Sequence, residues 1–175
     1  MSSLEAAGSG AHAAEVEQWL RDLGLTPIER ADREGITSWD LKLDGLRRFD
    51  IGVTVILDPA LALIVWVHFA PPIMDRFRVS YRKLLRWNDE FPFAKFAIAA
   101  DGRPVLTGEL SPKLLTSDDL GLAVTRLLAI CDVLLEESAG WLWMGGRIPD
   151  AGDRESRQAA LFARYEDRLG DLRPA

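Results

Sequence analysis

Few side chains in this chain could do chemistry, and none of them stands in a catalytic arrangement. His68 lies in an apolar segment beside Trp66, with no second histidine near it in the sequence. A metal site needs three or four converging ligands, so we expect His68 to be a buried, hydrogen-bonded side chain. His12 precedes the first predicted helix, and we expect it to be exposed to solvent.

The nucleophile and carboxylate candidates also have ordinary structural explanations. Cys131 is the only cysteine, so no internal disulfide can form. It falls on the apolar side of a predicted helix, whereas a reactive thiol needs a basic and partly open setting. Asp118 and Asp119 follow Ser117 where that helix begins, so capping and the helix dipole account for them. Without a set of nucleophile, base and orienting group, we predict no enzyme activity, no metal and no cofactor.

A basic stripe is the strongest charge pattern. Arg78, Arg82 and Arg86 are spaced at i, i+4 and i+8 within a predicted helix over 75–88. Such rows are commonly solvated helix faces. The alternative is that the stripe docks an acidic partner or a phosphate backbone. Because the net charge of the chain is −6, the electrostatic attraction to phosphate is unfavourable overall, and we do not expect direct nucleic-acid binding.

Length and composition are those of an ordinary globular protein. The chain has 175 residues, of which 27% are charged and 48% apolar, and this favours one domain with an appendage. Residues 1–11 are small and rich in Gly and Ser, without the pattern of a signal peptide. The longest apolar run, 61–70, is much shorter than the ~20 residues that span a bilayer. We therefore expect a cytoplasmic protein with no membrane contact.

The elements of the first half follow from the spacing of apolar residues. A helix is predicted from Ala13 to Leu23, with Gly24 after its end. The charged stretch that follows, to about Gly35, predicts a loop. Three strands are then predicted over 36–43, 48–57 and 61–69, with turns at Asp44-Gly45 and Asp58-Pro59.

The third of these strands, 61–69, is apolar on both of its faces. Leu63, Val65 and Val67 point one way, whereas Ile64 and Trp66 point the other way. A strand with this pattern is covered on both faces. In a small antiparallel sheet, the second cover must come from another segment of the chain or from another chain.

The second half continues with a helix, a hairpin and a leucine-rich helix. Pro92 ends the helix over 75–88, because proline lacks the backbone donor. Segments 93–99 and 103–110 predict a hairpin across Asp101-Gly102. The order predicts a two-layer α+β fold, with a twisted antiparallel sheet of about five strands, helices on one face and a C-terminal helical extension.

Three short motifs resemble the YbjN family of bacterial proteins. They are LLRWNDEFPFAKFAI at 84–98, the DGR turn with VLTGEL at 101–110, and LTSDDL at 115–120. The resemblance covers about residues 12–137. It implies the α-β-β-β-α-β-β-α order of a type III secretion chaperone-like fold. It also implies a protein-binding, chaperone-like or regulatory role without catalysis, usually as a homodimer.

Residues 138–175 form an extension beyond the resemblance. Trp141, Trp143 and Met144 lie in its first part, together with three glycines. One reading is that these apolar side chains pack on the protein itself; the other is an arm that grips a second subunit or a client. Residues 153–170 predict a helix, which needs a surface such as the strand over 61–69 or a partner.

The predicted function is therefore non-catalytic protein binding by a chaperone-like or regulatory homodimer. Clients of unknown identity would be held by apolar surface near the sheet and the arm, or by a strand added to a sheet edge. The alternative is a small regulator that acts on nucleic acid, directly or through a DNA-bound protein. The residues predicted to bind protein are Trp66, Arg78, Arg82, Arg86, Trp141, Trp143 and Met144.

Overall fold

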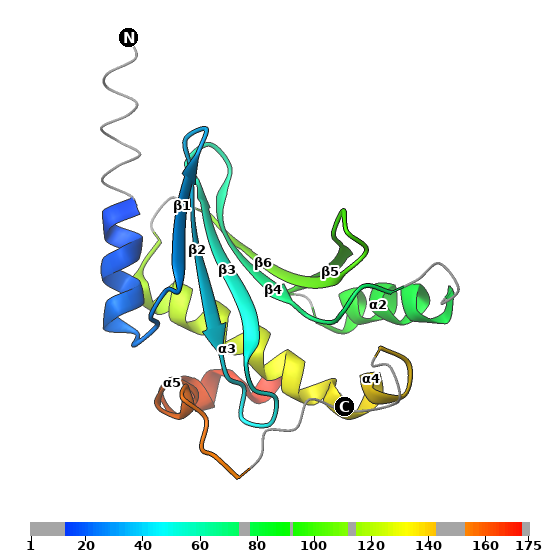
Figure 1. Ribbon diagram of the computed structural model, residues 1–175. Helices are drawn as coiled ribbons and strands as arrows, with labels where there is room; N and C mark the ends of the chain where they lie inside the picture. The colour runs from blue at the N-terminus through cyan, green and yellow to red at the C-terminus, as the bar shows by residue number, and fades with distance from the viewer. Residues whose placement is uncertain (1–12, 74–77, 92, 112–114, 143–152, 173–175) are drawn as a thin grey trace.

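The chain forms an open antiparallel sheet of six strands with its helices on one side (Figure 1). The computed structural model describes residues 13–73, 78–91, 93–111, 115–142 and 153–172. The strands follow the order β1-β2-β3-β4-β6-β5 across the sheet. Their bounds are β1 Glu29–Arg33, β2 Ile36–Leu43, β3 Ile51–Asp58, β4 Ala62–His68, β5 Lys95–Ile98 and β6 Pro104–Leu110.

The helices are distributed along the whole chain. An N-terminal helix covers residues 13–22. It is followed by α2 (Arg78–Glu90), α3 (Ser117–Val133), α4 (Leu135–Leu142) and α5 (Ala159–Tyr165), and by the 3₁₀ turns η2 (Glu166–Arg168) and η3 (Gly170–Leu172). The α+β class is confirmed, with six strands instead of about five. No helix in the described part of the chain has the length and apolar character that a bilayer span requires.

The additional strand, β1, was wrongly predicted to be a loop. Its sequence, ERADR, has no apolar alternation, because both of its sides are largely exposed at the edge of the sheet. β1 pairs with β2 from Glu29 opposite Asp40 to Arg33 opposite Ile36. The tight turn between the two strands has φ of 52° at Glu34 and 82° at Gly35. Positive φ at both central positions suits a two-residue hairpin, but glutamate does not signal it.

The N-terminal helix ends just before Gly24, as predicted from the sequence. Gly24 has φ of 68°, and its N–H donates to the carbonyl of Arg21 at 3.0 Å. The N–H of Leu25 donates to the carbonyl of Leu20 at 2.8 Å. These two bonds form a Schellman ending. They return the chain toward the sheet with Leu20 and Leu25 both buried.

Three contacts place the helices on the same face of the sheet. The indole Nε1 of Trp39 in β2 donates to Glu17 of the N-terminal helix at 3.3 Å. Leu127 of α3 lies against Gly108 of β6, and Figure 1 shows α3 crossing behind the strands. The ring of Trp87 in α2 lies 5.2 Å from that of Phe96 in β5. The hydrophobic core therefore fills the space between this face and the helices.

The connection between β2 and β3 is longer than the predicted two-residue turn. It comprises residues 44–50, and β3 begins only at Ile51. Asp132 of α3 accepts hydrogen bonds from three consecutive backbone N–H groups of this loop, at 2.5, 3.1 and 2.7 Å. A Cβ on Gly45 would lie 2.3 Å from the Asp132 carboxylate, so glycine is needed for this approach. The loop is thus shaped by a residue distant in the sequence.

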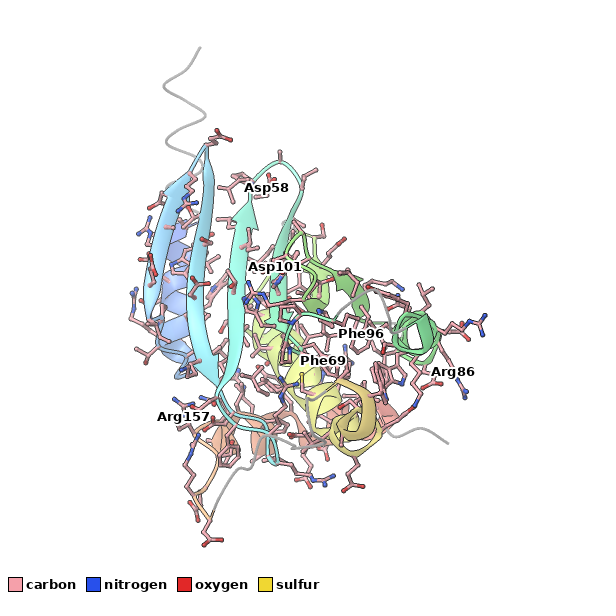
Figure 2. The ribbon with its side chains drawn as sticks, turned by 45° about the vertical axis from the view of Figure 1, so that its right-hand side comes forward. Asp58, Phe69, Arg86, Phe96, Asp101 and Arg157 are labelled. Carbon is pink, nitrogen blue, oxygen red and sulfur yellow. The ribbon has the colours of Figure 1, made fainter. Side chains whose placement is uncertain are left out.

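An aromatic cluster lies between α2 and the end of the sheet. α2 ends at Glu90, and Phe91 is buried. In β5, Phe96 meets Phe69 and Trp87 with centroid distances of 5.1 to 6.0 Å. Figure 2 shows Phe69 and Phe96 pointing into the interior between the sheet and α2. The cluster attaches α2 to the end of the sheet.

The C-terminal helix rests on α3 and not on β4. Buried Leu161, Phe162 and Tyr165 belong to α5, which contacts α3. The Tyr165 hydroxyl donates to Asp118 at 3.0 Å, and its ring lies against Gly121. The strand β4 therefore does not supply the surface for this helix. The side chains on its second face, among them Ile64 and Trp66, are only partly buried.

Candidate protein-binding face

One face of the sheet is covered by none of the described helices, and we call it the open face. Side chains alternate along a strand, so the positions between the buried ones in β2, β3 and β4 point away from the helices. These positions are partly or fully exposed. The open face includes Ser38, Asp40, Thr54, Ile56, Ile64, Trp66, His68 and Lys95, together with Thr107, which is buried.

Trp66 lies within a row of paired residues that crosses all six strands. Register places Thr54 of β3 on one side of it and Thr107 of β6 on the other. Beyond Thr54 come Asp40 of β2 and then Glu29 of β1, and beyond Thr107 comes Lys95 of β5. The Thr54 hydroxyl donates to the Asp40 carboxylate at 2.5 Å, and the Thr107 hydroxyl donates to the Lys95 carbonyl at 3.4 Å. The row therefore has Trp66 between two threonines, with two acidic residues on one side and one lysine on the other.

A second row adds apolar surface beside Trp66. Ile56 pairs with Ile64, and both are partly exposed. Ile36, near the start of β2, has 38% of its surface exposed. An apolar centre with a polar surround is the composition of a protein-binding surface.

His68 lies at one end of the open face next to a charged turn. Gly52 pairs with it across the strands, and a Cβ there would come within 3.1 Å of the imidazole. Burial, followed by the nearby Arg103 guanidinium, lowers the pKa of His68. Its Nδ1 atom is buried and has no hydrogen-bond partner within the described ranges, which differs from the predicted hydrogen-bonded histidine. Among the described residues, no group of three or more His, Cys, Asp or Glu side chains could hold a metal ion.

The two edges of the sheet are poor templates for a further strand. Along β1, the exposed edge carries Glu29, Arg30 and Asp32, and charges of this kind discourage edge pairing. At the opposite edge, the side chain of Asn88 donates to the Phe96 carbonyl at 3.2 Å and accepts from the Phe96 N–H at 2.6 Å. The side-chain amide of Asn88 thus occupies the backbone groups that an added strand would use.

The arginine stripe is only partly described. Arg78 begins α2, but its side chain lies outside the described set. Arg82 and Arg86 are exposed. Arg86 forms an ion pair with Glu90 at 2.7 Å, while 80% of its side chain remains exposed, and Figure 2 shows it pointing away from α2 into solvent. The stripe is separated from the open face, because α2 packs on the other side of the sheet.

Trp141 packs on the protein itself. Its ring lies 5.4 Å from that of Trp87, its Nε1 donates to the Glu137 carbonyl at 2.7 Å, and the Lys83 ammonium lies over the ring at 5.2 Å. Trp143 and Met144 lie outside the described residues. Whether this segment also contacts a client stays a prediction.

The other candidates for chemistry have structural roles. Burial raises the pKa of the Cys131 thiol to about 12, so it is protonated at neutral pH and unsuited to nucleophilic attack. Thr116 caps α3 one residue earlier than predicted, in a capping box with Asp119. The Asp118 carboxylate instead binds Tyr165, and that hydrogen bond lowers its pKa. His12 lies outside the described residues.

Sequence reasoning identified Trp66 but missed its neighbours in the row. Asp40 and Lys95 are 55 positions apart in the sequence, and only the strand register places them at equal distances from Trp66. The sequence did contain one indication of these neighbours. On this side of the strands, threonine and charged residues stand between apolar ones.

Comparisons with known proteins identify a family and a solved structure to which part of the chain is similar. The model of the YbjN family, described as a putative bacterial sensory transduction regulator, matches residues 12–138. No curated protein matches the chain. A crystal structure of the Yersinia pestis type III secretion chaperone SycH, in complex with a stable fragment of YscM2, is 19% identical with a TM-score of 0.48. The match covers 70% of this chain and 98% of that chain.

Proposed function

Because the chain belongs to the YbjN family, we propose that it is a non-catalytic, chaperone-like or regulatory homodimer that acts in the cytoplasm by binding proteins. The proposal places the binding surface on the open face of the sheet. Residues 138–175, of which all but the first lie beyond the family match, form an appendage in this proposal.

The observation that carries the proposal is the position of Trp66. A tryptophan at the centre of an uncovered sheet face, with Ile56 and Ile64 beside it, offers a large apolar contact area. Tryptophan is enriched where interfaces are most strongly bound. The hydroxyl of Thr54 and the charges of Asp40 and Lys95 supply the polar surround. Such a face gains free energy when another polypeptide covers it.

Binding across the face is favoured over addition of a strand at an edge. Asn88 already bonds both backbone groups of Phe96 on β5, and the β1 edge is charged. A partner that lies on the open face needs neither edge. The apolar residues of the face would then be the main determinants of affinity.

A nucleic-acid role is less well supported by the geometry. Of the two stripe arginines with described side chains, Arg86 is paired with Glu90. Asp89 is exposed on the same helix. These carboxylates oppose the approach of a phosphate backbone.

A photo-crosslinking experiment tests the proposal directly. The photoreactive amino acid p-benzoylphenylalanine replaces Trp66 in the full chain, expressed in bacterial cells, and adducts are identified by mass spectrometry. A matched variant carries it at Leu85, which is 68% exposed on α2. We expect protein adducts from position 66 and few from position 85. Absence of protein adducts at 66, or a predominance of nucleic-acid adducts, would contradict the proposal.

A further inference from the structure

We propose that the face of α3 beneath α5 is a second protein-docking surface, which residues 153–172, here called the strap, cover until a partner segment displaces them. The segment that fits this surface is amphipathic, with large apolar side chains on one side and arginines before and after them. The surface lies on the helix side of the sheet, away from the open face. The inference therefore goes beyond the proposed function of the open face and does not depend on it.

The strap is ordered by the surface on which it rests. α5 has seven residues, and helices shorter than about 12 residues are marginal in water without tertiary contacts. Gln158, which precedes α5, makes no side-chain cap hydrogen bond to it. Its side chain instead accepts from the N–H of Asp44 at 2.5 Å. The strap also lies beyond residues 12–138, which the family model matches, so it is an addition to the family domain.

Contacts between arginine and aspartate hold the strap at both of its ends. Asp44, at the end of β2, binds two arginines of the strap, and Asp118, in the first turn of α3, binds two more. The four arginines are Arg154, Arg157, Arg164 and Arg168. Between 41% and 48% of each arginine side chain is exposed. Because solvent reaches these ion pairs, salt screens them, and the two aspartates can exchange one arginine-bearing segment for another.

Between the two aspartates, the strap presents apolar side chains to α3. Leu161, Phe162 and Tyr165 are buried. The ring of Tyr165 lies against Gly121, where a Cβ would come within 2.3 Å of the tyrosine hydroxyl. This is the mode in which the amphipathic helices of partner proteins bind to apolar grooves. The strap therefore shows which chemistry the surface accepts.

The strap does not fill the space that the surface offers. A cavity of about 720 Å³ remains between the loop after β2, the end of α3 and α5 (Figure 1). On the side of the strap it is lined by Ala159 and Ala163, which lie on one face of the helix because they are four residues apart. Val133 and Leu46, which is 55% exposed, also line it. A partner with leucine at the two alanine positions would bury more apolar surface and bind more tightly than the strap.

Tethering explains how a segment with small side chains keeps the surface covered. The strap belongs to the same chain, so its effective concentration at α3 is on the order of millimolar. A partner in solution displaces it only if its own contacts are better, and the cavity is where better contacts are available. The strap thus sets a threshold of affinity that excludes weak partners.

Binding of a peptide to the full chain tests the docking surface. The probe is a fluorescein-labelled peptide with the sequence of residues 153–172 carrying Ala159→Leu and Ala163→Leu. Fluorescence anisotropy measures its dissociation constant with the wild-type chain and with a Phe162→Ala chain, in which the strap is weakened. We expect the Phe162→Ala chain to bind the probe at least tenfold more tightly, because loss of a buried phenylalanine weakens the competitor. The same peptide with both native alanines should bind at least tenfold more weakly than the probe.

Further variants separate displacement of the strap from loss of the fold. A chain with Arg164→Ala and Arg168→Ala, both at exposed positions, weakens the strap without a change in the core and should also bind the probe more tightly than the wild type. Addition of Asp118→Asn to the Phe162→Ala chain removes the charge that the arginines of the probe need, and should weaken binding about fivefold or more. Leu85→Ala, at an exposed position on α2, is the matched control and should bind like the wild type.

Hydrogen exchange of the wild-type chain shows whether the strap opens by itself. We expect the amides of α5 to exchange at least a hundredfold faster than those of β3 and β4, and the difference to grow in about 0.5 M salt. Equal exchange rates in α5 and β4 would overturn the inference, because the strap would then open only with the whole fold. So would a probe that binds no chain, or that binds the weakened-strap chains no better than the wild type. None of these results affects the crosslinks expected from Trp66, which test the proposed function separately.

Discussion

Arg157 holds the buried carboxylate of Asp44 through three hydrogen bonds, from its backbone N at 3.1 Å, its Nε at 2.8 Å and its Nη2 at 2.7 Å. Arg154 adds two more, at 2.6 and 3.1 Å. The Asp44 side chain has no exposed surface, and it also accepts from the N–H of Asp50 at 2.9 Å. One carboxylate thus joins the end of β2, the following loop and the C-terminal segment.

Replacement of Asp44 by Asn should therefore destabilise the protein. The amide retains the size of the side chain but loses the charge and one acceptor. Hydrogen bonds to charged groups contribute about 1.5–3 kcal/mol, so we expect the free energy of unfolding to fall by about 2–3 kcal/mol in urea titrations. Asp153→Asn, at an exposed position in the same segment, is the control and should unfold like the wild type. Equal midpoints for Asp44→Asn and the control would refute this role for Asp44.

The same contact predicts a pH dependence. Burial acts to raise the pKa of Asp44, but the hydrogen bonds from Arg157 and Arg154 outweigh it and hold that pKa far below its ordinary value. A lowered folded-state pKa contributes stability above the unfolded-state value, near 3.9 for Asp, and that stability is lost as the pH falls toward the folded-state value.

The stability difference between wild type and Asp44→Asn should therefore be constant near neutral pH and shrink below about pH 4. Asp132 titrates in the opposite sense, because burial raises its pKa, but it is present in both proteins and cancels in the difference. Urea unfolding of both proteins at pH 7 and pH 3 measures the effect. A difference that persists unchanged at pH 3 would show that the Asp44 charge is not its source.

Two glycines should respond to alanine in opposite directions. A Cβ on Gly121 would lie 2.3 Å from the Tyr165 hydroxyl and 2.7 Å from Leu23, so Gly121→Ala should displace α5 from α3 and cost about 1–3 kcal/mol by overpacking. Gly140 in α4 has no atom within 4 Å of the corresponding position. Gly140→Ala should stabilise by up to about 1 kcal/mol through helix propensity. Thermal unfolding of both variants tests the contrast, and stabilisation by Gly121→Ala would disprove the close packing of α5 on α3.

Loss of Asn88 should open the β5 edge. Asn88→Ala removes both bonds to the Phe96 backbone, and we expect a loss of about 1–2 kcal/mol of stability and faster hydrogen exchange at the Phe96 amide. Asn88→Asp keeps the acceptor for the Phe96 N–H but places a charge at its carbonyl, so exchange at this amide should remain slower than in Asn88→Ala. Unchanged exchange in both variants would mean that Asn88 does not protect the edge.

The elements with strong local patterns were predictable from sequence. Alternation identified β4 and its double apolar character, helical spacing identified α3, and Gly24 marked a helix end. β1 was missed because an exposed edge strand needs no apolar pattern. The loop over 44–50 was missed because its shape depends on Asp132, 84 to 86 positions away.

The candidate site was predictable only in part. Trp66 was found because an apolar side chain on the solvent side of a strand breaks the expected alternation. The placement of Asp40 and Lys95 in its row depends on pairing between strands that are distant in the sequence, and no local rule gives that register. The sequence left two interpretations of Trp141 open. Its contact with Trp87 depends on α2 and α4 lying next to each other, which no local pattern predicts.

Hydroxyl-radical footprinting of Trp66 in the full chain shows whether another polypeptide covers the open face. We expect oxidation of Trp66 to decrease as the protein concentration rises through the range of association. Oxidation of Phe93, which is 51% exposed and outside the proposed contact, should stay constant. Trp66 oxidation that is equally fast at every concentration, and in the presence of bacterial cell extract, would contradict the proposed role of the open face.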